Sequence, residues 1–184
     1  MKKYPSNRPD KDTHFFNRAR TAAERSTCLR RKVGAIIVRD GVEVSSGYVG
    51  APRGIEHCID RGKCLRIDLG IPSGERYELC RSVHAEQNAI INAARIGTSI
   101  LGAKMYISSE RISGKYRNKD HDTNRIYGPC IICKKEILNA GLVEVFMREE
   151  NIGTASYTKK QLIRMLEDEE QRNTQVSHSP SIRK

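Results

Sequence analysis

Four stretches of the chain place apolar residues at helical spacing. They cover residues 14–29, 84–96, 130–140 and 157–168. The clearest pattern is that of the second stretch, in which Ala85 and Ala89 begin one apolar stripe. Ser82 and Gly97 are its expected N-cap and C-terminal stop, and Thr13 is the expected N-cap of the first stretch. The sequence therefore predicts four helices.

Four shorter stretches are rich in β-branched residues or alternate apolar with polar positions, which is typical of strands. They cover residues 33–39, 42–48, 102–108 and 142–147. Asp40 and Gly41 form a hairpin-type pair between the first two, so these two strands are expected to be antiparallel. The later strands alternate with helices, which favours parallel pairing. The order predicts an α/β protein with helices on both faces of its sheet.

Polar stretches at the two ends divide the chain into an arm, one domain and a tail. Residues 1–13 contain two prolines and are expected to form a flexible arm. Residues 171–184 are polar and Ser-rich, and are expected to be disordered. The domain between them covers residues 14–170. It contains an irregular segment at 55–81 and an inserted loop at 109–128, which is dense in charge, Asn and Gly.

Composition restricts the class of protein further. Lys and Arg exceed Asp and Glu by 11, which favours anionic partners but does not separate a free nucleotide from a polynucleotide. We expect neither a transmembrane helix nor a secretory signal, because no long apolar run occurs. Cysteines that cluster with His and Glu indicate metal binding in a reducing compartment, so a cytoplasmic location is expected.

Metal-ligand and acid–base residue types occur together in two distant parts of the chain. His84 and Glu86 precede the clearest apolar stripe, and Pro129, Cys130 and Cys133 lie far downstream. Two thiolates and an imidazole suit zinc, and three protein ligands leave one coordination position open, as in catalytic zinc sites. The pattern H-x-E…P-C-x-x-C is the signature of zinc nucleobase deaminases.

Together with other stretches, this motif resembles the deoxycytidylate deaminase family of the zinc cytidine deaminase superfamily. The similar stretches are residues 26–28, 32–38, 47–54, 84–93 and 129–141. The resemblance covers residues 14–148 apart from the insertion. It implies a three-layer α/β/α cytidine-deaminase-like sandwich with a mixed five-stranded sheet. It also implies a homo-oligomer, which is often a hexamer in this family, and some members are activated by dCTP and inhibited by dTTP.

The resemblance implies roles for the motif residues. His84, Cys130 and Cys133 would hold a catalytic zinc that lowers the pKa of water. Glu86 would pass a proton from that water to the pyrimidine ring and then protonate the leaving ammonia. The implied reaction is hydrolytic deamination of dCMP to dUMP and ammonia. A structural zinc, or a core histidine beside chance cysteines, is the alternative interpretation.

Four cysteines remain outside the motif, namely Cys28, Cys58, Cys64 and Cys80. In some deoxycytidylate deaminases the positions that resemble Cys28 and Cys58 help to bind a second, structural zinc. Cys64 and Cys80 would complete such a site, with His57 as a substitute ligand. A second zinc would hold the irregular segment, which has little apolar content of its own. Four buried cysteines without metal are the alternative.

The sequence departs from the family on the substrate side. Val49 stands where the family has an Asn that contacts the substrate sugar, and valine cannot form a hydrogen bond through its side chain. Arg53 and Arg25 are candidates for the monophosphate, and Ala85 is a further candidate contact. The insertion supplies more basic residues, namely Arg111, Lys115, Arg117, Lys119 and Arg125. Three tyrosines are candidates for stacking on the base, namely Tyr48, Tyr127 and Tyr157.

Three functions therefore compete. The first is deamination of dCMP. The second is deamination of another nucleotide, or of a base in tRNA or single-stranded DNA, although the chain lacks the basic stripe with interleaved aromatics that stacks successive bases. The third is a nucleotide-binding protein without catalysis, which the intact Glu86 disfavours because binding alone requires no proton shuttle.

Overall fold

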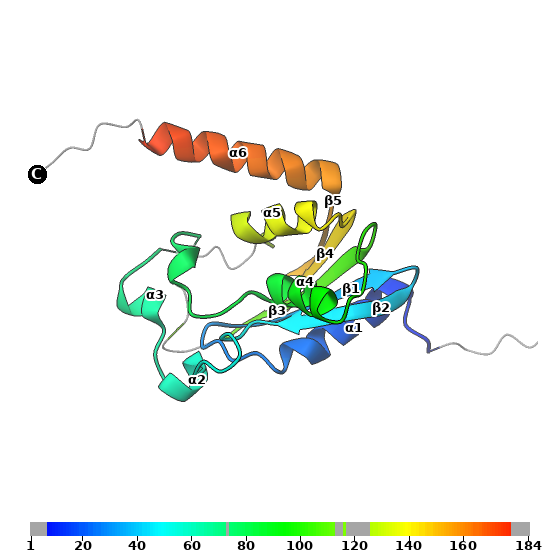
Figure 1. Cartoon of the computed structure of the whole chain (residues 1–184), viewed down its shortest axis with the longest axis horizontal. Helices are drawn as coiled ribbons and strands as arrows, with labels where there is room; N and C mark the ends of the chain where they lie inside the picture. Colours follow the sequence, from blue (N-terminus) through cyan, green and yellow to red (C-terminus); the bar gives the residue numbers. More distant parts are fainter. Residues whose placement is uncertain (1–6, 73, 113–115, 117–125, 178–184) are drawn as a thin grey trace, which may run out of the picture.

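The computed structural model describes residues 7–72, 74–112, 116 and 126–177. Figure 1 shows how the elements are arranged. In chain order these are α1 (Lys11–Ala23), β1 (Arg31–Arg39), β2 (Val42–Tyr48), α2 (Cys58–Arg61), α3 (Leu65–Asp68), the 3-10 helix η1 (Tyr77–Leu79), α4 (Ala85–Arg95), β3 (Lys104–Arg111), α5 (Ile131–Asn139), β4 (Glu144–Glu149), β5 (Gly153–Thr158) and α6 (Lys159–Ser177). No helix in the described part of the chain combines the length and apolar character that crossing a bilayer requires.

The strands form one mixed five-stranded sheet in the order β2-β1-β3-β4-β5. β1 and β2 form the expected antiparallel hairpin, and Asp40 and Gly41 both adopt positive φ angles, of 53° and 80°, at its turn. β3 and β4 are parallel, as the strand–helix alternation predicted. The β1–β3 and β4–β5 pairs are antiparallel. The prediction of a mixed five-stranded sheet is confirmed.

Helices cover both faces of this sheet (Figure 1). On one face, α1 buries Phe15, Phe16 and Ala19 against Ile36 and Tyr106 of the sheet. On the other face, residues of α4, α5 and α6 pack with the sheet in the main hydrophobic core. The described residues therefore form the predicted α/β/α sandwich, and the face under α4 and α5 carries the predicted motif.

Two glycines allow helices to approach the sheet closely. A Cβ atom added to Gly34 would lie 2.2 Å from the carbonyl oxygen of Ala19 in α1. A Cβ atom added to Gly47 would lie 2.3 Å from the backbone nitrogen of Ala89 in α4. Any larger residue at position 47 would therefore displace α4, the helix that follows His84.

The first helix differs from its predicted boundaries. Asp10, rather than Thr13, is the N-cap of α1, because its side chain accepts a hydrogen bond from the Thr13 backbone nitrogen at 2.8 Å. Residues 11–13, which were expected in a flexible arm, are therefore helical. The helix ends at Ala23 instead of residue 29, since Ser26 exchanges hydrogen bonds with the backbone of Val33 and turns the chain toward the sheet.

The C-terminal part differs most from the prediction. Residues 153–158 form the edge strand β5, whose sequence Gly-Thr-Ala-Ser-Tyr-Thr has no apolar alternation because no residue of it is fully buried. The following helix α6 begins at Lys159, so Tyr157 lies in the strand. α6 continues to Ser177, and residues 171–177, which were expected to be disordered, are helical. Residues 178–184 lie outside the described residues.

Candidate functional site

Two helix N-termini bring the motif together. His84 is the N-cap of α4 and Cys130 is the N-cap of α5, and both have extended backbones, with φ/ψ of −71°/158° and −64°/166°. The Gln87 side chain accepts a hydrogen bond from the His84 backbone nitrogen at 2.9 Å, which stabilises the start of α4. Ser82 as N-cap of α4 is therefore wrong. The motif residues themselves occupy the cap positions.

The three predicted metal ligands meet at these helix starts. Nδ1 of His84 lies 3.4 Å from Sγ of Cys130 and 3.3 Å from Sγ of Cys133. Among the described residues, these three form the group whose possible ligand atoms all lie within 4.8 Å of one another. Tetrahedral zinc with ordinary bond lengths places a nitrogen and a sulfur ligand about 3.6 Å apart. The donor set and its spacing therefore fit zinc.

In the absence of metal, the pKa values of His84, Cys130 and Cys133 are shifted in different directions. Burial disfavours the charged imidazole, but hydrogen bonds to Cys130 and Cys80 raise the pKa of His84 to about 11. The hydrogen bond from the Cys133 thiol, with a further contribution from His84, lowers the pKa of Cys130 to about 4. That same hydrogen bond and burial raise the pKa of Cys133 well above its usual value. The metal-free cluster is thus an imidazolium, a thiolate and a thiol.

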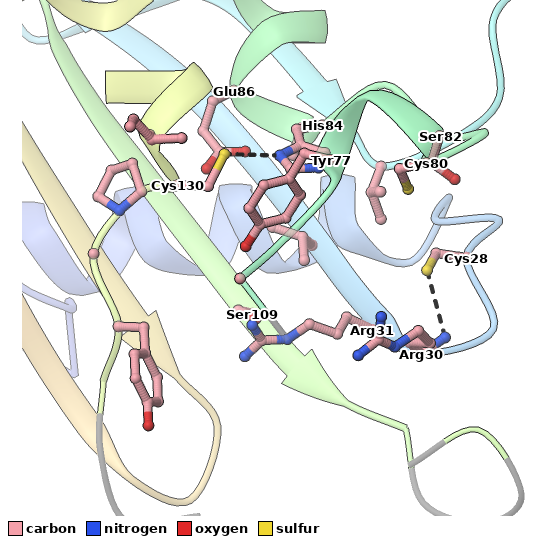
Figure 2. A pocket seen from close by; sticks show the side chains of 18 of the residues that line it. Cys28, Arg30, Arg31, Tyr77, Cys80, Ser82, His84, Glu86, Ser109 and Cys130 are labelled. Carbon is pink, nitrogen blue, oxygen red and sulfur yellow. Dashed lines mark hydrogen bonds between the residues drawn. The ribbon is translucent and has the colours of Figure 1, made fainter. Parts of the chain in front are cut away.

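Glu86 lies in the first turn of α4, two residues beyond His84, and only 7% of its surface is exposed. Burial raises the pKa of this carboxyl group above its usual value. The positive end of the α4 dipole favours a carboxylate at this position. Figure 2 shows Glu86 beside Cys130 and His84. A buried carboxyl group next to a metal-ligand cluster has the surroundings of a general acid and base.

The cluster opens into a cavity of about 1160 Å³. His84, Glu86 and Cys130 line it, and so do two of the predicted substrate contacts, Val49 and Ala85. Arg53 and Arg25 are exposed and are not among the lining residues, and Arg53 instead donates to Asn92 on the surface at 3.2 Å. The structure therefore does not bring these two arginines to the site.

Of the three tyrosines proposed to stack on a base, Tyr127 and Tyr157 line the cavity and Tyr48 does not. Sequence reasoning missed Tyr77, which also lines it and packs against His84 (Figure 2). The Arg66 guanidinium lies over the Tyr77 ring, with its central carbon 4.8 Å from the ring centroid. Arg66 itself is 5% exposed and donates to the carbonyl oxygens of Pro72 and Glu75. The segment expected to be irregular thus forms a wall of the cavity.

Sequence reasoning also missed a group of arginines at the end of the sheet. Arg30, Arg31 and Arg111 line the cavity, and of these three only Arg111 is among the basic residues predicted from the insertion. Arg31 is the first residue of β1, and its approach to Arg111 depends on the pairing of β1 with β3, for which the sequence carries no local signal. The remaining basic residues proposed from the insertion, at 115, 117, 119 and 125, lie outside the described residues.

The four remaining cysteines all line the same cavity and come from separate parts of the chain. Burial raises the pKa of Cys28, and nearby Cys80 and Cys64 add to this rise. Figure 2 shows Cys28 and Cys80 near one another. Cys58 contacts the Ser82 hydroxyl at 3.8 Å, whereas His57 contacts the Thr27 hydroxyl at 3.2 Å. The thiols are neighbours, although they are not as compact as the His84 cluster.

Known proteins have sequences similar to this chain. The deoxycytidylate deaminase of Schizosaccharomyces pombe is 33% identical over 138 residues, which is 75% of this chain and 37% of that protein. ComE operon protein 2 of Bacillus subtilis is 34% identical over 74% of this chain and 58% of its own length. The deoxycytidylate deaminase of Mycobacterium phage D29 is 32% identical over 78% of this chain and 98% of its own length.

Solved structures share the fold. The dCMP deaminase of cyanophage S-TIM5 in its apo form has a TM-score of 0.56 and 24% identity, over 88% of this chain and 93% of that chain. The cytidine deaminase of Burkholderia pseudomallei has a TM-score of 0.53 and 17% identity, over 82% and 94%. The family model described as the cytidine and deoxycytidylate deaminase zinc-binding region matches residues 9–149. The chain therefore belongs to the cytidine and deoxycytidylate deaminase family.

Proposed function

We propose that this protein is a zinc-dependent hydrolase that deaminates dCMP to dUMP and ammonia. One observation carries the proposal: His84 and Cys130 of the three-residue cluster line the same cavity as Glu86, whose carboxyl group is buried. Several similar proteins are named deoxycytidylate deaminase, although the matched region is only 37% of the Schizosaccharomyces pombe protein. The S-TIM5 enzyme, which shares the fold, binds dCMP and dUMP.

His84, Cys130 and Cys133 would hold the zinc through one nitrogen and two sulfur atoms. When bound, zinc supplies a Lewis acid that makes water acidic enough to ionise near neutral pH. Placement of Cys130 at the N-cap of α5 favours its thiolate form, which is the form that binds metal. Two of the ligands sit at helix N-caps, so the cluster is positioned by backbone geometry before any ligand binds.

Glu86 would move the protons. Its carboxylate would accept a proton from the attacking water and deliver it to N3 of the pyrimidine. It would then accept the remaining proton from the new C4 hydroxyl and deliver it to the amino group that leaves as ammonia. Burial favours this role, because a raised pKa brings the carboxyl group closer to the operating pH. A protein that only bound nucleotides would have no need for a buried carboxyl group beside the metal cluster.

The test is an ammonia-release assay with the zinc-loaded protein and five substrates: dCMP, CMP, dCTP, deoxycytidine and a short single-stranded oligonucleotide. We expect the highest kcat/KM with dCMP. Preferential release from the oligonucleotide would support a nucleic-acid deaminase instead. Release from none of them would contradict deamination and favour a binding protein.

Val49 bears directly on this test. Its side chain is 7% exposed and lines the cavity, and backbone hydrogen bonds of 3.0 Å to Val33 and Thr27 hold its position. An apolar side chain at this point cannot bond a sugar hydroxyl. We therefore expect weaker discrimination between dCMP and CMP than an Asn would provide. Val49→Asn should increase the preference for dCMP.

We also propose a second, structural zinc on Cys28, Cys58, Cys64 and Cys80. The support is that all four thiols line one cavity and that three of them raise the pKa of their neighbours. Metal analysis should find two zinc ions per chain, and Cys58→Ser should reduce this to one while lowering the melting temperature. One zinc per chain in fully active protein would contradict the second site.

Location and assembly follow from the same proposal. We propose a cytoplasmic homo-oligomer, with six subunits as in other members of the family, and regulation by dCTP and dTTP. Sedimentation of the zinc-loaded protein with and without these nucleotides would test both points. A monomer at micromolar concentration would contradict the assembly, and unchanged kinetics with both nucleotides would contradict the regulation.

A further inference from the structure

The two helices that begin at the metal cluster are attached to different parts of the fold. Their N-caps, His84 and Cys130, lie 46 positions apart in the sequence. α4 packs on β1 and β2, whereas α5 packs against α6, although residues of both helices belong to the main hydrophobic core. Apolar packing is non-directional. A polar contact between α4 and α5 therefore adds a directional constraint on the spacing of the metal ligands.

Gln87 provides a polar contact of this kind. Its Oε1 atom accepts a hydrogen bond from the backbone nitrogen of His84 at 2.9 Å. Its Nε2 atom donates to Oε1 of Glu136 in α5 at 2.8 Å. Glu136 lies three residues after Cys133, so the two side chains share one side of α5. A single amide group therefore joins the N-cap of α4 to the helix turn that follows Cys133.

The two hydrogen bonds explain why the residue is a glutamine. The backbone N–H of His84 needs an acceptor and the Glu136 carboxylate needs a donor, and a side-chain amide offers both on one planar group. A glutamate at position 87 would face Glu136 with a second carboxylate, and a leucine would form neither bond. The bond to Glu136 has a carboxylate acceptor and is partly buried, so it is stronger than a neutral bond at the surface.

We propose that Gln87 is a positioning residue, which couples α4 to α5 through Glu136 and thereby sets the distance of His84 from the two cysteine ligands. The alternative is that Gln87 only caps α4, as Glu or Gln does at the third position of many helices. Substitutions of the groups that orient metal ligands typically change metal affinity about 10- to 100-fold. This inference rests on the proposed function in one respect, namely that the metal is zinc, and it is independent of the substrate.

Gln87→Glu separates coupling from capping. Glutamate retains the acceptor for the His84 N–H, and its charge suits the positive end of a helix, so capping alone predicts a zinc affinity that is unchanged or higher. Coupling predicts zinc binding about tenfold weaker, because two carboxylates would face each other between α4 and α5. Gln87→Glu combined with Glu136→Gln restores one donor and one acceptor in exchanged places, so its affinity should lie within about twofold of wild type. Competition with a chelator measures these affinities.

The chain contains a matched control at the start of α6. Gln161 accepts a hydrogen bond at 2.8 Å from the backbone nitrogen of Thr158, three residues before it, as Gln87 does from His84. Gln161 is exposed, and α6 carries none of the proposed zinc ligands. Gln161→Glu therefore makes the same chemical change at the same capping position, and it should leave zinc affinity within about twofold of wild type.

Cobalt(II) in place of zinc gives a second readout, because its absorption bands depend on the arrangement of its ligands. Gln87→Glu should change these bands relative to wild type, and the exchanged pair should restore them. Glu136→Ala is the second single variant, for use if Gln87→Glu does not fold, and it should bind zinc about fivefold more weakly because the bond to Gln87 is lost. Glu136→Gln keeps an acceptor for Gln87 and should bind zinc nearly as wild type does.

Wild-type zinc affinity and cobalt bands in Gln87→Glu, or in Glu136→Ala where the first variant does not fold, would overturn the positioning role. A loss in Gln87→Glu that the exchanged pair does not restore would also overturn it, because the loss would then arise within α4. Neither readout depends on turnover. The expected pattern of affinities would support the positioning role even if no nucleotide released ammonia, and unaltered affinities in an active deaminase would overturn it while the proposed function stands.

Discussion

Tyr77 lies edge-on to His84, with ring centroids 5.3 Å apart and an interplanar angle of 83°. Edge-to-face contacts of this kind contribute about 1 kcal/mol beyond simple burial. Tyr77 comes from the 3-10 helix η1, so the segment before the motif orients the His84 imidazole.

The first prediction concerns this contact. Tyr77→Leu should weaken zinc binding about fivefold, because the imidazole loses the ring that orients it. Tyr77→Phe retains the ring and should bind zinc as wild type does. Competition with a chromogenic chelator measures both affinities. Equal affinities in the wild type and in Tyr77→Leu would remove the orienting role.

The second prediction concerns the proposed proton shuttle. Glu86→Gln should retain zinc and lower kcat for dCMP by about 1,000-fold or more, because an amide cannot carry the proton. Glu144→Gln, which changes a surface carboxylate paired with Lys104, is the control and should be fully active. Metal content and ammonia release are measured on the same samples. Activity within tenfold of wild type in Glu86→Gln would rule out the role.

The third prediction concerns protons released by metal binding. At pH 7 the metal-free site holds protons on His84, whose pKa is about 11, and on Cys133, whose pKa is well above its usual value. Both protons must leave when zinc binds, so about two protons per zinc should be released. Since both pKa values lie above 7, zinc affinity should rise with pH from 7 to 9 and fall as pH decreases.

Calorimetry in buffers that differ in ionisation enthalpy counts these protons directly. Cys130 should contribute almost nothing at pH 7, because its pKa of about 4 leaves it already ionised. A release of less than half a proton per zinc at pH 7 would contradict this distribution of protons.

The fourth prediction uses the two glycines beneath the helices. Gly47→Ala and Gly34→Ala should each destabilise the protein by about 2 kcal/mol or more, because the added methyl group collides with helix backbone. Only Gly47→Ala should also weaken zinc binding, since α4 carries His84 and α1 carries no motif residue. Thermal unfolding and chelator competition would distinguish them. Equal losses of zinc affinity would show that general destabilisation explains both.

Elements with a strong apolar period were predictable from the sequence. The pattern of residues 84–96 identified α4 to within a residue or two, and the β1–β2 hairpin was visible from Asp40 and Gly41. β5 was not, because an exposed edge strand has no buried face and hence no alternation. The length of α6 was also missed, since its polar sequence resembles that of a disordered tail.

The candidate site also contains residues that the sequence could identify and residues that it could not. His84, Glu86, Cys130 and Cys133 were identifiable because a metal centre requires specific residue types at specific spacing. The arginine nearest the motif loop in sequence, Arg53, lies outside the cavity, whereas Arg31 and Arg111 line it. Their approach depends on the pairing of β1 with β3, which joins residues 80 positions apart. Contacts of that kind have no local signature.

His84 and Cys130 are the boundaries at which loops become helices. A loop that ends at an N-cap can change composition while the cap keeps its place, and the segment between η1 and His84 is one such loop. Evolution can therefore vary the walls of the cavity independently of the metal ligands. Because the cavity walls and the N-cap residues belong to different segments, substitutions in the walls can change the substrate while the residues at the N-caps keep the same reaction.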